Sequence, residues 1–142
     1  YTSNAHPIEI VDDGGLHTIY LWSYVDRYLI AEIKNANYEQ VDNAVRAVFG
    51  MDIIALSQNK GINFSALAKL RASQYLQNAM VSTWTYLPSV GIKSETSPNG
   101  ISTFYSYDGL GRLMEIYRYK NNSFNENDKE VLEQHTYYRS NK

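Results

Sequence analysis

The segment that most constrains the fold is Thr103–Ile116, where strand-like alternation surrounds a glycine-rich turn. Before the turn, Tyr105 and Tyr107 share one face and Phe104 lies on the other, and this period of two is typical of a half-buried strand. Residues 108–111, Asp-Gly-Leu-Gly, contain the residue types that a tight hairpin connection requires. Alternation resumes in residues 113–119. The sequence therefore predicts an antiparallel hairpin in which Arg112 can pair with Asp108 across the turn.

The same segment contains the pattern Tyr-x-Tyr-Asp-x-x-Gly-Arg-Leu, which resembles the YD repeat of rearrangement-hotspot (RHS) proteins. The residues that carry the motif, and that we expect to be structural, are Tyr105, Tyr107, Asp108, Gly111, Arg112 and Leu113. The preceding residues 98–101, Pro-Asn-Gly-Ile, are similar to the turn that opens each such repeat. Residues 78–86 resemble the version of the YD repeat that is found in Bacteroidetes. The alternative is an ordinary aromatic hairpin with a surface ion pair of small energetic value.

Weaker copies of the motif occur elsewhere in the chain. Trp84-Thr85-Tyr86 precedes Tyr105-Ser106-Tyr107 by 21 residues, and Trp22-Ser23-Tyr24 is followed by a Glu-Ile pair at the same distance as in the hairpin. Residues 133–138 resemble the first strand of a further unit. Repeats of this length cannot bury an apolar face alone and are stabilised by stacking on neighbours. We therefore predict a degenerate hairpin repeat at 8–36 and YD-repeat hairpins at 78–139.

Residues 37–77 show helical rather than strand periodicity. Asn37 and Gln40 form a capping-box pattern before an apolar stripe that ends at Gly50, and Asp52 and Asn63 are expected to cap two shorter helices. The predicted fold class is α+β, an antiparallel sheet of consecutive YD-type hairpins with a helical insertion at about 37–77. The whole chain, 1–142, is predicted to form a single domain.

Composition limits the classes of partner. The net charge of −2 disfavours nucleic acid as an electrostatic partner, and no apolar run approaches the ~20 residues of a membrane-spanning helix. The chain has no cysteine, which excludes disulfides and thiolate metal sites. It begins with Tyr1 and shows no signal-peptide pattern, so we expect a mature product or an excised fragment.

We find no catalytic constellation in the sequence. His6, His17 and His135 lie far apart, and none has a second ligand at metal-binding spacing. Residues 121–126 lack the central glycine of a calcium loop and are expected to be solvated. The prediction is a protein that is not an enzyme and has no metal and no cofactor.

The feature left for binding is a row of aromatic side chains at alternating strand positions. Its proposed ligand-binding members are Trp22, Tyr24, Trp84, Tyr86, Tyr105 and Tyr107, with Tyr117 and Tyr119 on a neighbouring strand. If several of these rings are exposed on one face, they form a stacking platform for sugars, and neutral sugars suit this acidic chain better than polyanions. The alternative is cross-strand aromatic pairing that stabilises the sheet.

The resemblance implies a non-enzymatic structural segment of a long YD-repeat protein, located at the cell surface or outside the cell. The implied partners are neighbouring repeats of a longer parent chain. Open strand edges near Ile8 and Tyr138 also predict self-association. Some RHS proteins form a hollow shell and resemble one another in a self-cleavage motif that contains a proline and an aspartate. Ile92 and Ser97 stand at these two positions here, so self-cleavage is not expected. The alternative function is a carbohydrate-binding or adhesive module that uses the aromatic face.

Overall fold

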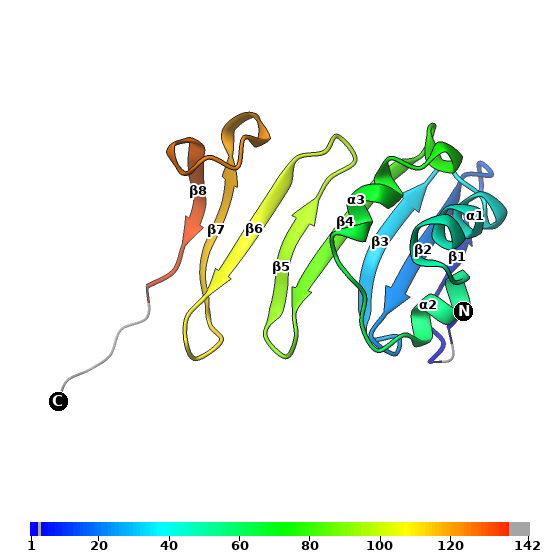
Figure 1. The fold of residues 1–142 in the computed structure, drawn as a ribbon, viewed down its shortest axis with the longest axis horizontal. Helices are drawn as coiled ribbons and strands as arrows, with labels where there is room; N and C mark the ends of the chain where they lie inside the picture. The colour runs from blue at the N-terminus through cyan, green and yellow to red at the C-terminus, as the bar shows by residue number, and fades with distance from the viewer. Residues whose placement is uncertain (3, 137–142) are drawn as a thin grey trace. The chain divides into compact units, whose positions relative to one another are not determined.

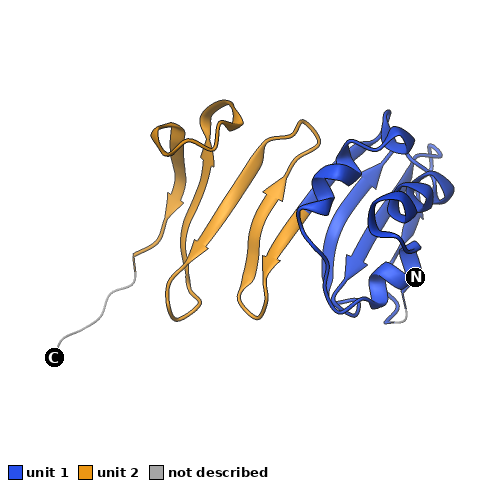
Figure 2. Ribbon diagram, in the orientation of Figure 1, with its two compact units in different colours: residues 1–83 blue, residues 84–142 orange. Residues whose placement is uncertain are grey.

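The computed structural model describes residues 1–2 and 4–136 of the chain. Within this part, eight antiparallel strands follow one another in chain order in a sheet, accompanied by three α-helices, which confirms the predicted α+β class. The chain divides into two compact units, Tyr1–Thr83 and Trp84–Lys142 (Figure 2). The single domain expected from the sequence stays a prediction, as does the YD type of the hairpins.

Unit 1 begins with three consecutive antiparallel strands, β1 (Glu9–Val11), β2 (His17–Ser23) and β3 (Tyr28–Lys34). The first half of β4 (Met80–Leu87) pairs with β3, so that this strand resumes the sheet after the helical residues. A register shift between Leu21 and Trp22 interrupts the β2–β3 ladder shortly before the turn.

The helical stretch contains α1 (Tyr38–Phe49), α2 (Ile53–Gln58), α3 (Ala66–Arg71) and the 3-10 turn η1 (Gln74–Leu76). The capping box of Asn37 and Gln40, the left-handed Gly50 and the cap at Asp52 are confirmed. The expected cap at Asn63 is wrong. Its side chain accepts hydrogen bonds from the backbone N–H and hydroxyl of Ser65, which closes a local turn and delays the helix until Ala66.

The core of unit 1 lies between the helices and one face of its sheet (Figure 1). The register places Ile19 opposite Ile33, and Ile33 opposite Val81, so these side chains form one row across three strands. The helices cover this row with buried side chains from each element, namely Val41, Ala44 and Val45 of α1, Ile53 and Leu56 of α2, and Leu67 and Leu70 of α3.

Unit 2 is a run of strands joined by tight turns. It comprises the second half of β4, β5 (Gly91–Thr96), β6 (Ser102–Tyr107), β7 (Leu113–Tyr119) and β8 (Lys129–Gln134). Two 3-10 turns, η2 (Lys120–Asn122) and η3 (Glu126–Asp128), connect β7 to β8. The last strand was expected to reach Tyr138 but ends at Gln134, and Tyr137 and Tyr138 lie outside the described residues.

The described part of unit 2 contains no α-helix, and its strands form a single layer of sheet. Of its described residues only Ser102 is buried, and every buried apolar side chain found in residues 1–2 and 4–136 belongs to unit 1. Apolar side chains of unit 2 are therefore covered only by their cross-strand and same-face neighbours. Candidate residues of unit 1 therefore lie beside a buried core, whereas the described candidate residues of unit 2 lie on a half-exposed sheet.

Candidate functional site

The six aromatic residues proposed for ligand binding fall into two groups that lie on separate units. Unit 1 holds Trp22 and Tyr24, whereas unit 2 holds Trp84, Tyr86, Tyr105 and Tyr107. All six side chains are half-buried rather than fully exposed. The row predicted from the sequence is therefore two local surfaces.

Trp22 is occupied by the N-terminal segment of its own chain. Its indole stacks on the imidazole of His6, with ring centroids 4.4 Å apart and an interplanar angle of 24°. Its Nε1–H donates a hydrogen bond of 2.8 Å to the carbonyl oxygen of Pro7. Because one ring face and the only donor of the indole are both in use, Trp22 holds the N-terminal segment against the sheet.

Tyr24 lies beyond the end of β2, in a left-handed backbone conformation with φ of 58°. Its ring stacks on Phe64 at 5.8 Å and meets the edge of Tyr28 at 5.2 Å. A Cβ atom at Gly61 would lie 3.3 Å from the same ring. Tyr24 therefore packs against the loop that precedes α3, and these contacts are structural.

The turn between β2 and β3 contains a buried carboxylate, that of Asp26, which was not predicted from the sequence. Asp26 accepts hydrogen bonds from the backbone N–H of Asn4 at 3.1 Å, from the Thr2 hydroxyl, and lies 3.3 Å from Nδ1 of His6. Burial raises the pKa of Asp26, but the hydrogen bonds from Thr2, Asn4 and His6 outweigh it and leave the pKa lowered overall. The turn is also held by a backbone hydrogen bond, which the Asp26 N–H donates to the carbonyl oxygen of Ser57. No local motif in the sequence indicated this contact, since its partners come from distant positions.

The four aromatic residues of unit 2 share one face of the sheet. The hydroxyls of Thr85 and Ser94 lie 2.5 Å apart, and Ser94 pairs with Phe104, so these three side chains point to one side. Side chains alternate along a strand. The opposite side therefore carries Trp84 and Tyr86 on β4 and Tyr105 and Tyr107 on β6.

Within this face, Tyr107 has a structural contact of its own. Its hydroxyl donates a 2.6 Å hydrogen bond to the carbonyl oxygen of Ile92. The ring end lies over Gly91, where an added Cβ would be 2.8 Å from the hydroxyl oxygen. Burial raises the pKa of Tyr107 and also that of Tyr105, to which the nearby Glu95 carboxylate contributes. Both phenols are therefore neutral at physiological pH.

The other face of unit 2 carries an aromatic cluster. Phe104 stacks on Tyr117 at 5.5 Å, and Tyr119 and Phe124 meet Phe104 edge-on at 5.7 and 6.0 Å. The Lys129 ammonium lies 4.3 Å from the Tyr117 ring centroid. The register explains the separation from Tyr105, because Phe104 pairs with Tyr117 whereas Tyr105 pairs with Ile116. Tyr117 and Tyr119 thus lie on the face opposite to Tyr105 and Tyr107.

The remaining motif residues form the β6–β7 turn. The Asp108 carboxylate accepts backbone hydrogen bonds from Leu110 and Arg112, both 2.9 Å, and a 2.8 Å bond from the Arg112 guanidinium. These contacts, the Arg112 backbone bond foremost, lower the pKa of Asp108. Gly111 has φ of 78°, a conformation that glycine adopts without strain. Leu113 opens β7 opposite Tyr107. The predicted pairing of Asp108 with Arg112 is confirmed.

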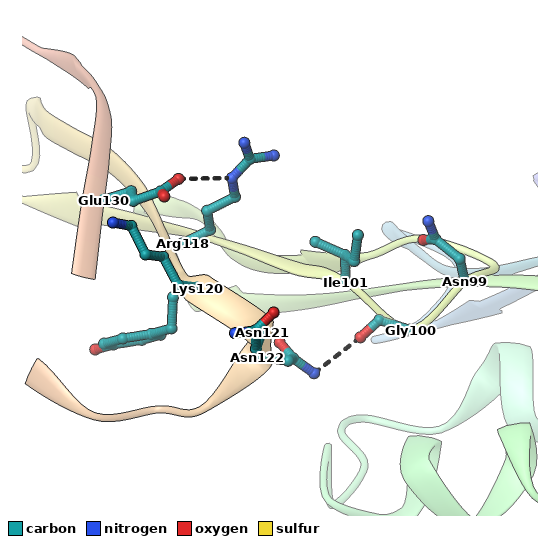
Figure 3. Close-up of a pocket in the computed structure, with 9 residues that line it drawn as sticks. Asn99, Gly100, Ile101, Arg118, Lys120, Asn121, Asn122 and Glu130 are labelled. Carbon is teal, nitrogen blue, oxygen red and sulfur yellow. Dashed lines mark hydrogen bonds and ion pairs between the residues drawn. The ribbon is translucent and has the colours of Figure 1, made fainter. Parts of the chain in front are cut away.

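An open pocket of about 600 Å³ lies where the β5–β6 turn approaches the end of β7 (Figure 3). The Asn122 side chain donates a 3.0 Å hydrogen bond to the carbonyl oxygen of Gly100 and ties the two segments together. Arg118 donates through Nε to Glu130 at 3.4 Å. Most of the residues that line this pocket are of polar type, and the lining comprises Asn99, Gly100, Ile101, Arg118, Tyr119, Lys120, Asn121, Asn122 and Glu130. Residues 121–126 were expected to form a solvated loop, and no motif in the sequence indicated this pocket.

Each histidine lies beside a single carboxylate rather than in a cluster of ligands. His6 contacts Asp26, and His17 lies 2.9 Å from Glu9. No group of three metal-ligating side chains occurs in the described part of the chain. The described helices include none that is long and apolar enough to cross a membrane.

No family model, curated protein or solved structure matches the chain. Its class therefore rests on its own geometry, an α+β protein with one helix-covered unit and one unit of single-layered sheet. Two surfaces of unit 2 are suited to contacts with other molecules: the aromatic face that includes Trp84 and Tyr105, and the polar pocket.

Proposed function

We propose that the chain is a non-enzymatic structural segment of a longer YD-repeat-like protein, exported to the cell surface or the medium. In this proposal the hairpins of unit 2 are continued and covered by neighbouring repeats. The observation that supports it most is the lack of any buried apolar side chain among the described residues of unit 2.

The lack of a buried core in the described part of unit 2 suggests a covering partner because burial of apolar surface is the main stabilising term in folding. Unit 2 leaves Val131 and Leu132 exposed by 46% and 49%, both on its last strand. In the described chain β8 pairs with β7 alone, so its other edge offers unpaired backbone groups. A further hairpin, from the parent chain or from a second molecule, would pair with this edge and cover these side chains.

The first test is the size of the native product, detected in its source cells with an antibody against this segment. A product far above the 16.3 kDa of this chain supports the structural proposal. A product near that mass that remains monomeric in light scattering across concentrations contradicts it, because nothing would then cover the sheet.

A second candidate function is carbohydrate binding, which the shared face of the four unit 2 aromatics favours. Aromatic rings on a rigid sheet provide flat apolar surfaces with polar edges. In residues 1–2 and 4–136, Tyr107 donates a structural hydrogen bond, whereas no side-chain hydrogen bond is found for Trp84 or Tyr105. Trp84 and Tyr105 are therefore the members best placed to contact a sugar ring.

Trp84→Ala and Tyr105→Ala distinguish the two functions. Lost folding, measured by circular dichroism and hydrogen exchange, favours the structural function. Lost retention on glycan columns by a variant that is still folded favours binding. Tyr75→Ala is the matched control, because Tyr75 is 40% exposed, belongs to unit 1 and is not a member of this face.

A further inference from the structure

The pocket of Figure 3 is built from the β5–β6 turn, the end of β7 with η2, and Glu130 of β8, and the Asn122 side chain joins the first two of these segments. Asn122, in a left-handed conformation with φ of 55°, donates its amide to the carbonyl oxygen of Gly100 at 3.0 Å. Asn121 precedes it with φ of 54°. Asparagine adopts this conformation more readily than most residues, and it turns the chain sharply at the pocket rim. These two segments are therefore fixed before any ligand arrives.

The lining is suited to a hydrophilic ligand. The volume of about 600 Å³ is of the size that small-molecule sites have. Ile101 supplies an apolar side chain to the pocket, whereas Asn99, Asn121 and Asn122 present amides. Amides both donate and accept hydrogen bonds, which matches the hydroxyls of a sugar.

The charges of the pocket leave one positive charge in excess. The Arg118 guanidinium uses Nε for Glu130, and its two terminal nitrogens point away from that carboxylate (Figure 3). The Lys120 ammonium takes part in no ion pair formed by residues 1–2 and 4–136. A ligand carboxylate that contacts the terminal nitrogens of Arg118 and the Lys120 ammonium would receive charge-assisted hydrogen bonds.

The pocket adjoins the aromatic face. Phe104 pairs with Tyr117, which places Thr103 opposite Arg118, and the alternation puts both on the same side of the sheet as Tyr105. A sugar chain lying along the rings of this face would reach the pocket with one residue.

We propose that this pocket binds a monocarboxylated sugar, a hexuronate, whose carboxylate is held by Arg118 and Lys120 and whose hydroxyls contact the asparagine amides. The proposal gives a ligand class to the carbohydrate-binding candidate and rests on it. It does not depend on the structural function.

The test is a titration of the isotope-labelled chain with methyl glucuronide, methyl glucoside and acetate, followed by NMR. With the glucuronide we expect saturable shifts at the amides of Gly100, Asn121 and Asn122. Lys120→Gln is expected to weaken binding about five- to tenfold, the effect of one exposed charge-assisted hydrogen bond. Lys69→Gln is the control, since Lys69 is exposed on α3 of unit 1 and does not line the pocket.

The outcomes separate the proposals. Binding of the glucuronide that weakens in Lys120→Gln, and in Arg118→Gln with an unchanged amide spectrum, supports the inference. Equal affinity for glucuronide and glucoside overturns it and leaves the carbohydrate-binding candidate standing. Equal affinity for acetate also overturns it, because the site then selects an anion and not a sugar. No shift with any of the three overturns both.

Discussion

The imidazole of His6 lies almost flat on the indole of Trp22, 4.4 Å from centroid to centroid. This contact joins the N-terminal segment to the second strand of unit 1. The same segment reaches the β2–β3 turn through Asp26, which contacts the Nδ1 atom of His6. Three interactions of different kinds, a ring stack, an indole hydrogen bond and a buried carboxylate, therefore hold Thr2 and residues 4–7 in place.

His6→Ala is expected to loosen this segment at a cost of about 0.5–1.5 kcal/mol, the value of a stacked ring pair. The indole N–H of Trp22 donates to Pro7, so its hydrogen exchange measures the opening directly. We expect faster exchange in the variant. His17→Ala, at a 40% exposed position beside Glu9, is the control. Unchanged protection of the Trp22 indole in His6→Ala would show that the stack is dispensable.

Asp26→Asn tests the buried carboxylate through the pH dependence of stability. The pKa of Asp26 is lowered in the folded chain from a reference of 3.8, so its contribution is fully present above that value and is lost as the pH falls through the lower, folded pKa. We expect the variant to lose about 1–3 kcal/mol at neutral pH. Below pH 3.8 the difference between the two proteins should shrink. A difference that stays constant in urea unfolding from pH 7 to 2 would contradict this account.

Gly91→Ala and Tyr107→Phe are expected to be coupled. The alanine Cβ would lie 2.8 Å from the Tyr107 hydroxyl oxygen and displace it from the Ile92 carbonyl, at a cost of about 1–3 kcal/mol. Tyr107→Phe alone removes one hydrogen bond, worth about 1 kcal/mol. Because the phenylalanine lacks the clashing atom, Gly91→Ala should cost less in that background. Hydrogen exchange in β5 and β6 provides the measurement, and additive effects would refute the contact.

Tyr117→Ala should destabilise unit 2 more than Phe124→Ala does. The Tyr117 ring contacts Phe104, Tyr119 and the Lys129 ammonium, whereas Phe124 is 58% exposed. We expect about 2–3 kcal/mol for the first substitution and less than about 1.5 kcal/mol for the second. Exchange protection in β6 and β7 reports both, with Tyr117→Phe as the control that keeps the ring. Equal losses would mean that the cluster does not act through burial.

The parts of the fold that could be predicted from the sequence depend on neighbours in the chain. The capping box at Asn37, the left-handed Gly50 and the Asp108–Arg112 turn need only a few successive residues, and all three are confirmed. The prediction that Asn63 caps a helix was wrong, because an asparagine that caps a helix and one that closes the preceding turn have the same local sequence pattern.

The candidate site was harder to predict, because it depends on register and on distant partners. Alternation placed Tyr105 and Tyr107 together, but only the pairing of Phe104 with Tyr117 separates the two faces of the hairpin. The Asp26 contacts join residues twenty or more positions apart, and so does the bond from Asn122 to Gly100. The sequence signal that relates residues 98–101 to residues 121–122 is their separation, which is close to the 21-residue spacing of the repeat.

The single-layered sheet of unit 2 also affects how this part of the chain folds and evolves. Each strand from β5 to β8 pairs with its neighbour in the chain, so contacts are close in sequence and loop-closure costs are small. Folding can begin at any of its hairpins and spread to the next, as in other repeat architectures. The buried apolar side chains found in residues 1–2 and 4–136 all belong to unit 1, so a hairpin at the end of this sheet can be gained or lost with repacking confined to the neighbouring strands.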